Sequence, residues 1–139
     1  MLMKIRAALV ALVVPIAVLA AAPAGAHEPP APPPYVDHAE WAHWGDQSSL
    51  RVYPTSSGRG AAAQIGTGVG ADEAWSEVLA VAPKADIPGM RAQFVCHWKL
   101  AEFATPGKTS WNLEPWRPVV DATEMIAAGC NPGGGVEPF

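Results

Sequence analysis

The alternation of apolar and polar residues is clearest in residues 49–55, SLRVYPT. Leu50 and Val52 fall on one face of an extended chain, and Arg51 and Tyr53 fall on the other. A period of two residues is typical of a half-buried strand. The pattern therefore predicts a β-strand that ends at the proline of this segment.

Two further segments show the same alternation. In residues 90–103 it predicts a second strand whose core face is formed by alternate residues: Phe94, Cys96, Trp98 and Leu100. The opposite face would carry Gln93, Val95, His97 and Lys99, which places the histidine on a half-open surface. A third strand is predicted around Trp111 and Leu113, both directed inward, with a bend at Pro115.

Helical periodicity occurs in two places. Residues 71–83 place Trp75, Val78, Leu79 and Ala82 on one stripe, which predicts the main helix. A short C-terminal helix is expected in residues 121–130, because Asp121 can cap its start, Glu124 follows three residues later, and Gly129 can end it.

The remaining segments have weaker patterns. Residues 37–44 contain Trp41 and Trp44 three positions apart, which suggests a short helix or an arm laid on the domain. The glycine-rich residues 56–71 are interpreted as a flexible loop or hairpin. Their G-T-G-V-G lacks the spacing of a dinucleotide-binding loop.

The N-terminus has the order of features of a secretory signal peptide. Lys4 and Arg6 precede an apolar run, and Ala24-Gly25-Ala26 supplies a cleavage pattern. The sequence therefore predicts a signal peptide in residues 1–26, a proline-rich leader in residues 27–36 and a single secreted domain in residues 37–139. The run of about 16 apolar residues is short for a retained anchor, which needs about 20.

The net charge of the predicted mature chain limits the classes of partner that it can bind. The signal segment holds two of the nine basic residues and none of the 13 acidic ones, so the mature chain carries a formal charge of −6. An acidic domain is poorly suited to nucleic acid or to anionic lipid. We expect no nucleic-acid partner, no membrane association after signal cleavage, and no cofactor or metal.

Cys96 and Cys130 are the two cysteines of the chain. An even count in an exported protein favours one disulfide, which would close a loop of about 35 residues and stabilise a small domain by about 4 kcal/mol. A metal site that uses both thiolates is the alternative, although no C-x-x-C spacing supports it.

Three blocks carry a family resemblance: SLRVYPTSSGR, QFVCHWKLAEF, and SWNLEPWRPVV followed by CNPGG. They resemble a family of small exported actinobacterial proteins, mycobacterial ones especially, that is catalogued as a domain of unknown function. The resemblance covers residues 41–139. It implies export and a Cys96–Cys130 pair, and it implies no activity.

His97 is the candidate for acid–base chemistry. Arg51, with Glu77 or Glu114 as a carboxylate, would complete the kind of set that small secreted nucleases use for proton transfer and charge stabilisation. The residue types fit this chemistry, but the sequence does not bring them together. A structural or surface histidine is the competing interpretation.

The stretch SWNLEPWRP offers a second candidate. Alternation predicts that Trp111 is in the core. Trp116 and Arg117 are adjacent between two prolines, which suits a guanidinium stacked on an indole, and Glu114 can hold that guanidinium by a charge-assisted bond. An aromatic platform for a sugar or peptide, built from Trp111, Trp116 and Arg117, is the functional alternative to packing.

These patterns predict an α+β fold with a small antiparallel sheet, one main helix, a short C-terminal helix and one disulfide. The expected function is a secreted or cell-wall-associated, non-enzymatic interaction module with an extracellular or cell-envelope partner. The alternative is a small secreted hydrolase or nuclease-type toxin that uses His97, Arg51 and a carboxylate.

Overall fold

The computed structural model of the protein describes residues 31–64 and 68–135, together with isolated positions among residues 1–30. The predicted signal peptide and the start of the proline-rich leader therefore lie outside the continuously described residues. Among the described residues, no helix is both long and apolar enough to span a bilayer.

The described residues form an antiparallel sheet of three strands in the order β1-β2-β3. The strands are β1 (Val36–Trp44), β2 (Gln47–Pro54) and β3 (Trp111–Leu113). Strand β2 lies between the other two, and Leu50 pairs with both Trp41 and Leu113. The strand predicted from the clearest alternation is thus the centre of the sheet.

Strand β1 corrects the expectation of a helix or arm in residues 37–44. Trp41 pairs with the buried Leu50 and packs against the core, while His43, paired with Ser48 near the hairpin, is exposed. The hairpin turns at Gly45, whose φ of 57° suits a tight two-residue connection. Pairing with β2 decides the conformation, and the spacing of the two tryptophans is not a helical signal.

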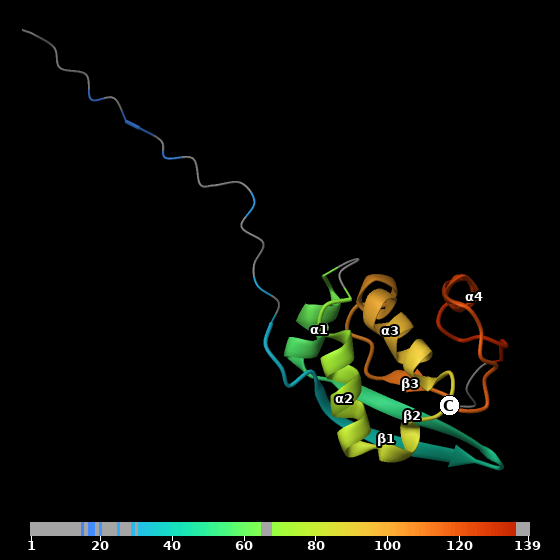
Figure 1. The fold of residues 1–139 in the computed structure, drawn as a ribbon. Helices are drawn as coiled ribbons and strands as arrows, with labels where there is room; N and C mark the ends of the chain where they lie inside the picture. The colour runs from blue at the N-terminus through green and yellow to red at the C-terminus, as the bar shows by residue number, and fades with distance from the viewer. Residues whose placement is uncertain are drawn as a thin grey trace, which may run out of the picture.

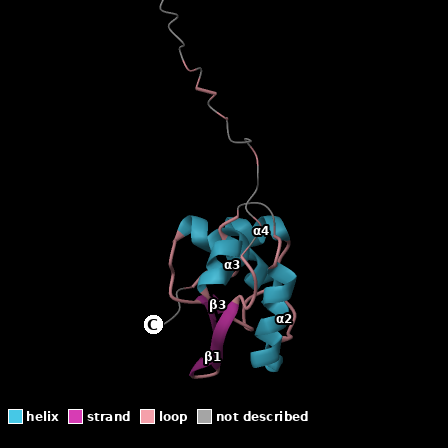
Figure 2. Ribbon diagram, turned by 90° about the vertical axis from the view of Figure 1, so that its left-hand side faces the viewer, coloured by secondary structure: helices cyan, strands magenta, loops and turns pink. Residues whose placement is uncertain are grey.

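The described residues after the hairpin include these helical segments: α1 (Ser56–Ala62), α2 (Ala71–Val81), the 3₁₀ turn η1 (Pro83–Ala85), α3 (Met90–Ala104) and, after β3, α4 (Ala122–Ala127). Helices α1, α2 and α3 gather beside the strands, and α4 lies beyond α3 (Figures 1 and 2). The α+β class, the antiparallel sheet, the helix at residues 71–81 and the short C-terminal helix are confirmed.

Helix α1 corrects the prediction of a loop or hairpin in residues 56–71. Thr55 caps the helix by accepting a hydrogen bond from the amide of Gly58 at 2.9 Å. A Cβ at Gly58 would collide with the backbone carbonyl of Tyr35. The glycine is therefore explained by close backbone contact and not by flexibility.

Helix α3 corrects the strand predicted in residues 90–103. Its buried residues include a stripe with helical spacing: Met90, Gln93, Phe94, His97, Trp98 and Ala101. Two members of the stripe are polar, which hides the helical period from a hydrophobicity pattern. The prediction of an inward Cys96 holds, but His97 is buried and does not lie on a half-open face.

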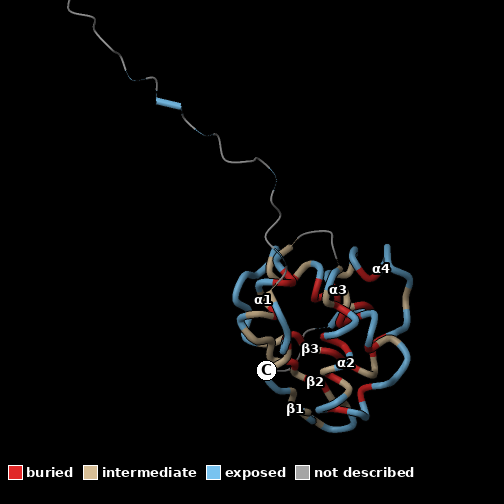
Figure 3. The backbone as a smooth tube through the Cα atoms, turned by 60° about the vertical axis from the view of Figure 1, so that its left-hand side comes forward, coloured by how far each residue is buried: buried red, intermediate tan, exposed pale blue. Residues whose placement is uncertain are grey.

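Aromatic rings fill the centre of the core between α3 and the sheet. The rings of Phe94 and Trp98 each lie about 6 Å from that of Trp111, at 6.1 and 6.0 Å between centroids. Trp75 and Tyr35 extend the cluster toward α2 and the start of β1. Buried positions concentrate along α3, β2 and β3, whereas α4 is largely exposed (Figure 3).

Candidate functional site

Trp111 occupies the core as its alternation predicts. Its side chain is 1% exposed, and its indole N–H has no hydrogen-bond partner among the described residues. Leu113, two residues later, is also fully buried and pairs with Leu50. Trp111 thus presents its ring to Phe94 and Trp98 and offers almost no surface to a ligand.

Glu114 and Arg117 form a buried ion pair, in which Nε of Arg117 donates to the carboxylate at 2.6 Å. The hydroxyl of Ser49 donates to the same carboxylate at 3.0 Å. The guanidinium also donates to the carbonyl of Pro132 at 3.2 Å, which ties the C-terminal segment to the chain that follows β3. Since a buried charge needs such partners, this network is a structural clamp.

Gln93 extends the clamp to helix α3. Its side-chain amide donates to the carbonyl of Glu114 and accepts from the amide of Glu114, both at 2.9 Å. The two bonds satisfy the backbone N–H and C=O of Glu114, just beyond β3, in the way that a neighbouring strand would. They join α3 to the sheet edge.

Trp116 is half-buried, and its indole N–H donates to the carbonyl of Ser48 at 3.1 Å. The guanidinium carbon of Arg117 lies 4.5 Å from the centre of the Trp116 ring, as the sequence predicts. The structure gives Trp111, Trp116 and Arg117 packing partners, and a ligand-binding role for them stays a prediction.

His97 lies within α3 and is 5% exposed. Its Nδ1 lies 2.8 Å from the carbonyl of Gln93, so this nitrogen carries the proton and donates. Burial lowers the pKa of His97 to about 4, the bond to Gln93 opposes that shift, and Lys108 lowers the pKa further. The imidazole is therefore neutral at pH 7.

The other two residues of the predicted catalytic set have different surroundings. The carboxylate of Glu77, on α2, accepts from the backbone amides of Tyr35 and Val36, both at 2.7 Å. Arg51 lies in β2, opposite Glu40 and Asn112. Glu77 and His97 are thus engaged with separate backbone groups, and Glu77 holds the start of β1 against α2.

The two cysteines form the expected disulfide, with a Cα–Cα distance of 5.5 Å. Cys96 comes from the middle of α3 and Cys130 from the residue after Gly129, which has a φ of 58° and ends α4. Asp121 caps α4 by accepting from the amide of Glu124 at 2.8 Å. The cap, the glycine stop and the disulfide all follow the sequence prediction.

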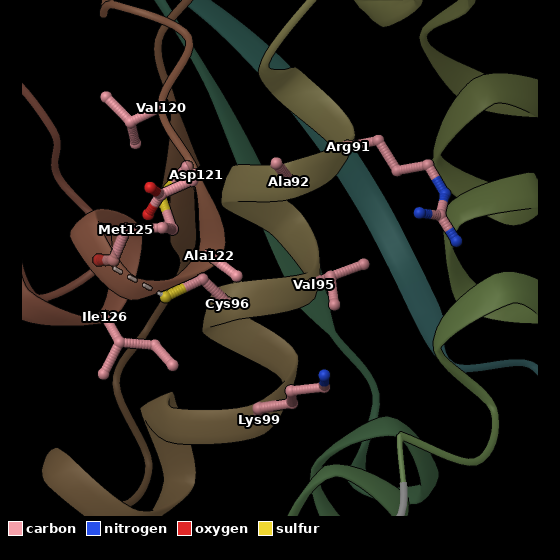
Figure 4. A pocket seen from close by; sticks show the side chains of 10 residues that line it. All are labelled: Arg91, Ala92, Val95, Cys96, Lys99, Val120, Asp121, Ala122, Met125 and Ile126. Carbon is pink, nitrogen blue, oxygen red and sulfur yellow. Dashed lines mark hydrogen bonds between the residues drawn. The ribbon is translucent and has the colours of Figure 1, made fainter.

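Beside the disulfide lies an open groove of about 240 Å³ between α3 and α4 (Figure 4). Its lining is mostly apolar and comes from both helices and the segment before α4: Arg91, Ala92, Val95, Cys96, Lys99, Val120, Asp121, Ala122, Met125 and Ile126. Ile126 is 58% exposed, and Val119 next to the lining is 66% exposed. These apolar side chains form a surface that the described part of the chain does not cover.

The strand interpretation of residues 90–103 missed this groove. On a helix, Ala92, Val95, Cys96 and Lys99 are spaced at i, i+3, i+4 and i+7 and so lie along one side. Figure 4 shows Cys96 and Met125 facing each other, while Arg91 extends from α3 toward α2. There Arg91 forms an ion pair with Asp72, which leaves Lys99 as the cation nearer the groove.

Residues 36–133 match the family model described as a protein of unknown function (DUF2599). The match spans both the clamp and the groove. The chain belongs to this family. The resemblance drawn from the sequence is thereby confirmed at the level of a family with no assigned activity.

Mycobacterial relatives support the same assignment. The chain is 61% identical over 111 residues to uncharacterized proteins of Mycobacterium tuberculosis and Mycobacterium bovis, covering 80% of this chain and 74% of each relative. An uncharacterized protein of Mycobacterium leprae is 52% identical over 100 residues, or 72% of this chain and 80% of that protein. No solved structure matches the fold.

Proposed function

We propose that this protein is a secreted, non-enzymatic binding module whose binding surface is the groove between α3 and α4. The observation that carries the proposal is the exposed apolar lining beside the disulfide, on a chain whose other large apolar side chains mostly pack into the core. An exposed apolar patch with a polar rim is typical of interaction sites.

The chemistry of the rim favours a peptide segment of an extracellular or cell-envelope protein. Lys99 stands on the α3 side and Asp121 on the α4 side, so the two edges carry opposite charges. A peptide with one or two apolar anchors can match both charges through its flanking side chains. A fatty acid has a single anionic head, so it could pair with Lys99 but would leave Asp121 without a partner.

The walls of the groove are held in place before any partner binds. The disulfide fixes Cys96 of α3 to the end of α4, and Met125 is buried against the same pair. A preformed site loses less conformational entropy on binding than a mobile one. This rigidity suits a binding module of small size.

The alternative function is a hydrolase that uses His97, Arg51 and Glu77. It requires a free carboxylate near the imidazole, but the Glu77 carboxylate is already bonded to two backbone amides. Glu114, the other candidate carboxylate, is bonded to Arg117 and Ser49. These contacts favour the binding module over the enzyme.

Selection from a displayed random peptide library tests the groove. We expect enriched peptides to share an apolar anchor and to lose binding when Ile126→Asp or Ala92→Glu places a charge on an exposed lining position. Val81→Asp on α2, where the valine is 55% exposed, is the matched control and should bind as the wild type does. Peptides that bind both groove variants at wild-type affinity would refute the proposal.

Secretion is a separate part of the proposal and rests on the charge, apolar run and cleavage pattern of residues 1–26. N-terminal sequencing of the protein from culture supernatant should find His27 or a residue close to it at the start. Recovery of the chain in membrane fractions alone, with Met1 intact, would contradict secretion.

A further inference from the structure

A second cavity, of about 140 Å³, lies at the C-terminal end of α3 and is independent of the groove. Its lining combines apolar side chains of α3 with polar groups from the loops: His97, Leu100, Ala101, Ala104, Thr105, Lys108, Gly129, Cys130 and Asn131. Cys96 lines the groove while Cys130 lines this cavity, so the disulfide separates the two sites.

His97 provides a hydrogen-bond acceptor at this cavity. The ring proton sits on Nδ1 and is donated to Gln93, so Nε2 keeps its lone pair. Among the described residues, Nε2 makes no hydrogen bond. Nε2 is not one of the fully buried polar atoms that lack a partner, so it is open to the cavity, where a ligand donor can take the place of solvent.

Lys108 provides a positive charge at the mouth of the same cavity. Its ammonium forms no ion pair with any described residue, and its charge lowers the pKa of His97. Its backbone carbonyl accepts from the guanidinium of Arg59 at 2.6 Å, which fixes the loop that carries it. Arg59 is in turn held by Glu102 of α3 at 2.6 Å.

These groups define the complementary ligand. The ammonium of Lys108 attracts a carboxylate, and Nε2 of His97 requires a donor. The donor should be a neutral hydroxyl, because the charge of Lys108 would repel a ligand ammonium at the imidazole. Thr105 and Asn131 add a hydroxyl and an amide to the lining.

We infer that this cavity binds a small hydroxycarboxylate, with its carboxylate at Lys108 and its hydroxyl donating to Nε2 of His97. The class includes hydroxy acids and the acid-bearing ends of sugar acids. The apolar wall of Leu100, Ala101 and Ala104 would contact the carbon skeleton of the ligand.

Lactate is the probe, and nuclear magnetic resonance titration of the disulfide-bonded protein is the measurement. We expect saturable shifts at the cavity residues and at Nε2 of His97. Acetate, which lacks the hydroxyl, should bind about fivefold more weakly, the effect of one hydrogen bond. Equal affinity for lactate and acetate would overturn the assignment of Nε2.

Two variants separate the contributions. Lys108→Gln should weaken lactate binding about threefold to fivefold, as expected for an exposed ion pair, while Lys84→Gln at a distant exposed lysine should not. His97→Phe keeps a ring but removes Nε2, and should abolish the preference for lactate over acetate. Binding unaffected by Lys108→Gln, or shifts that do not saturate, would refute the site even if His97→Phe fails to fold.

Discussion

The core around Trp111 and the cluster around Cys130 are held together by different means. The core joins the sheet to α1, α2 and α3 through many buried apolar side chains, with aromatic rings at its centre. The cluster that holds α4 contains three buried residues, Cys96, Met125 and Cys130, with Leu100 and Val120 packed against them. Packing and the buried clamp of Glu114 and Arg117 secure the first region, whereas a covalent bond secures the second.

The way each region is stabilised affects which of them can expose apolar side chains for binding. A six-residue helix such as α4 is marginal by itself and buries little surface here. The disulfide supplies the restraint that burial does not, so side chains such as Ile126 can remain exposed. The weakly packed region is therefore the one that can offer a binding surface, while the core positions it.

Trp111→Ala should have the largest effect, because it removes a fully buried ring from the centre of the core. We expect a loss of about 3–5 kcal/mol, which is close to the whole stability of a small domain. Thermal melts followed by circular dichroism measure it. A melting temperature near that of the wild type would contradict the core role of this residue.

Removing the disulfide with Cys96→Ala and Cys130→Ala should cost about 4 kcal/mol, from the loop of the 34-residue separation. The loss should be uneven. Amide hydrogen exchange should accelerate more in residues 121–130 than in β2, because β2 belongs to the other region. Uniform acceleration along the chain would show that the two regions unfold as one.

Lowering the pH should destabilise the protein through His97, which lies between the two regions. The pKa in the folded state is about 4, below the ordinary 6.5, so the unfolded state binds a proton first. The contribution of the neutral His97 to the free energy of unfolding is fully present above pH 6.5. It is lost as the pH drops toward 4, by roughly 3 kcal/mol. Urea titrations at a series of pH values give the free energy of unfolding. Between pH 6.5 and 4 that free energy should fall more steeply for the wild type than for His97→Phe.

An equal pH dependence of the free energy of unfolding for the two proteins would contradict the burial of a neutral imidazole. The comparison with His97→Phe is needed because carboxylates also titrate at low pH.

Asp121→Ala should have the smallest effect, about 0.5–2 kcal/mol, because it removes only the cap of α4. The loss should appear as faster exchange in α4 and a small drop in melting temperature. Thr123→Ala, at an exposed position of the same helix, is the control. A larger loss than that from removal of the disulfide would reverse the order of the two restraints.

Local patterns were sufficient for several features. The sequence by itself determined strand β2, helix α2, the cap and stop of α4, the Cys96–Cys130 bond and the Glu114–Arg117 pair. Each depends on residues close together in the sequence or, for the disulfide, on the number of cysteines in the chain. A three-residue separation, for example, was enough to place Arg117 near both Glu114 and the neighbouring Trp116.

Only the tertiary structure decided β1, α1, α3 and what lies around His97. Residues 90–104 fit both periods, and the helix prevails because Gln93 and His97 are buried through bonds that no hydrophobicity pattern registers. Gly58 allows a helix where its backbone meets Tyr35, 23 residues earlier in the chain. The groove and the cavity follow from where α4 is attached to α3, and long-range contacts of this kind are not encoded in local sequence.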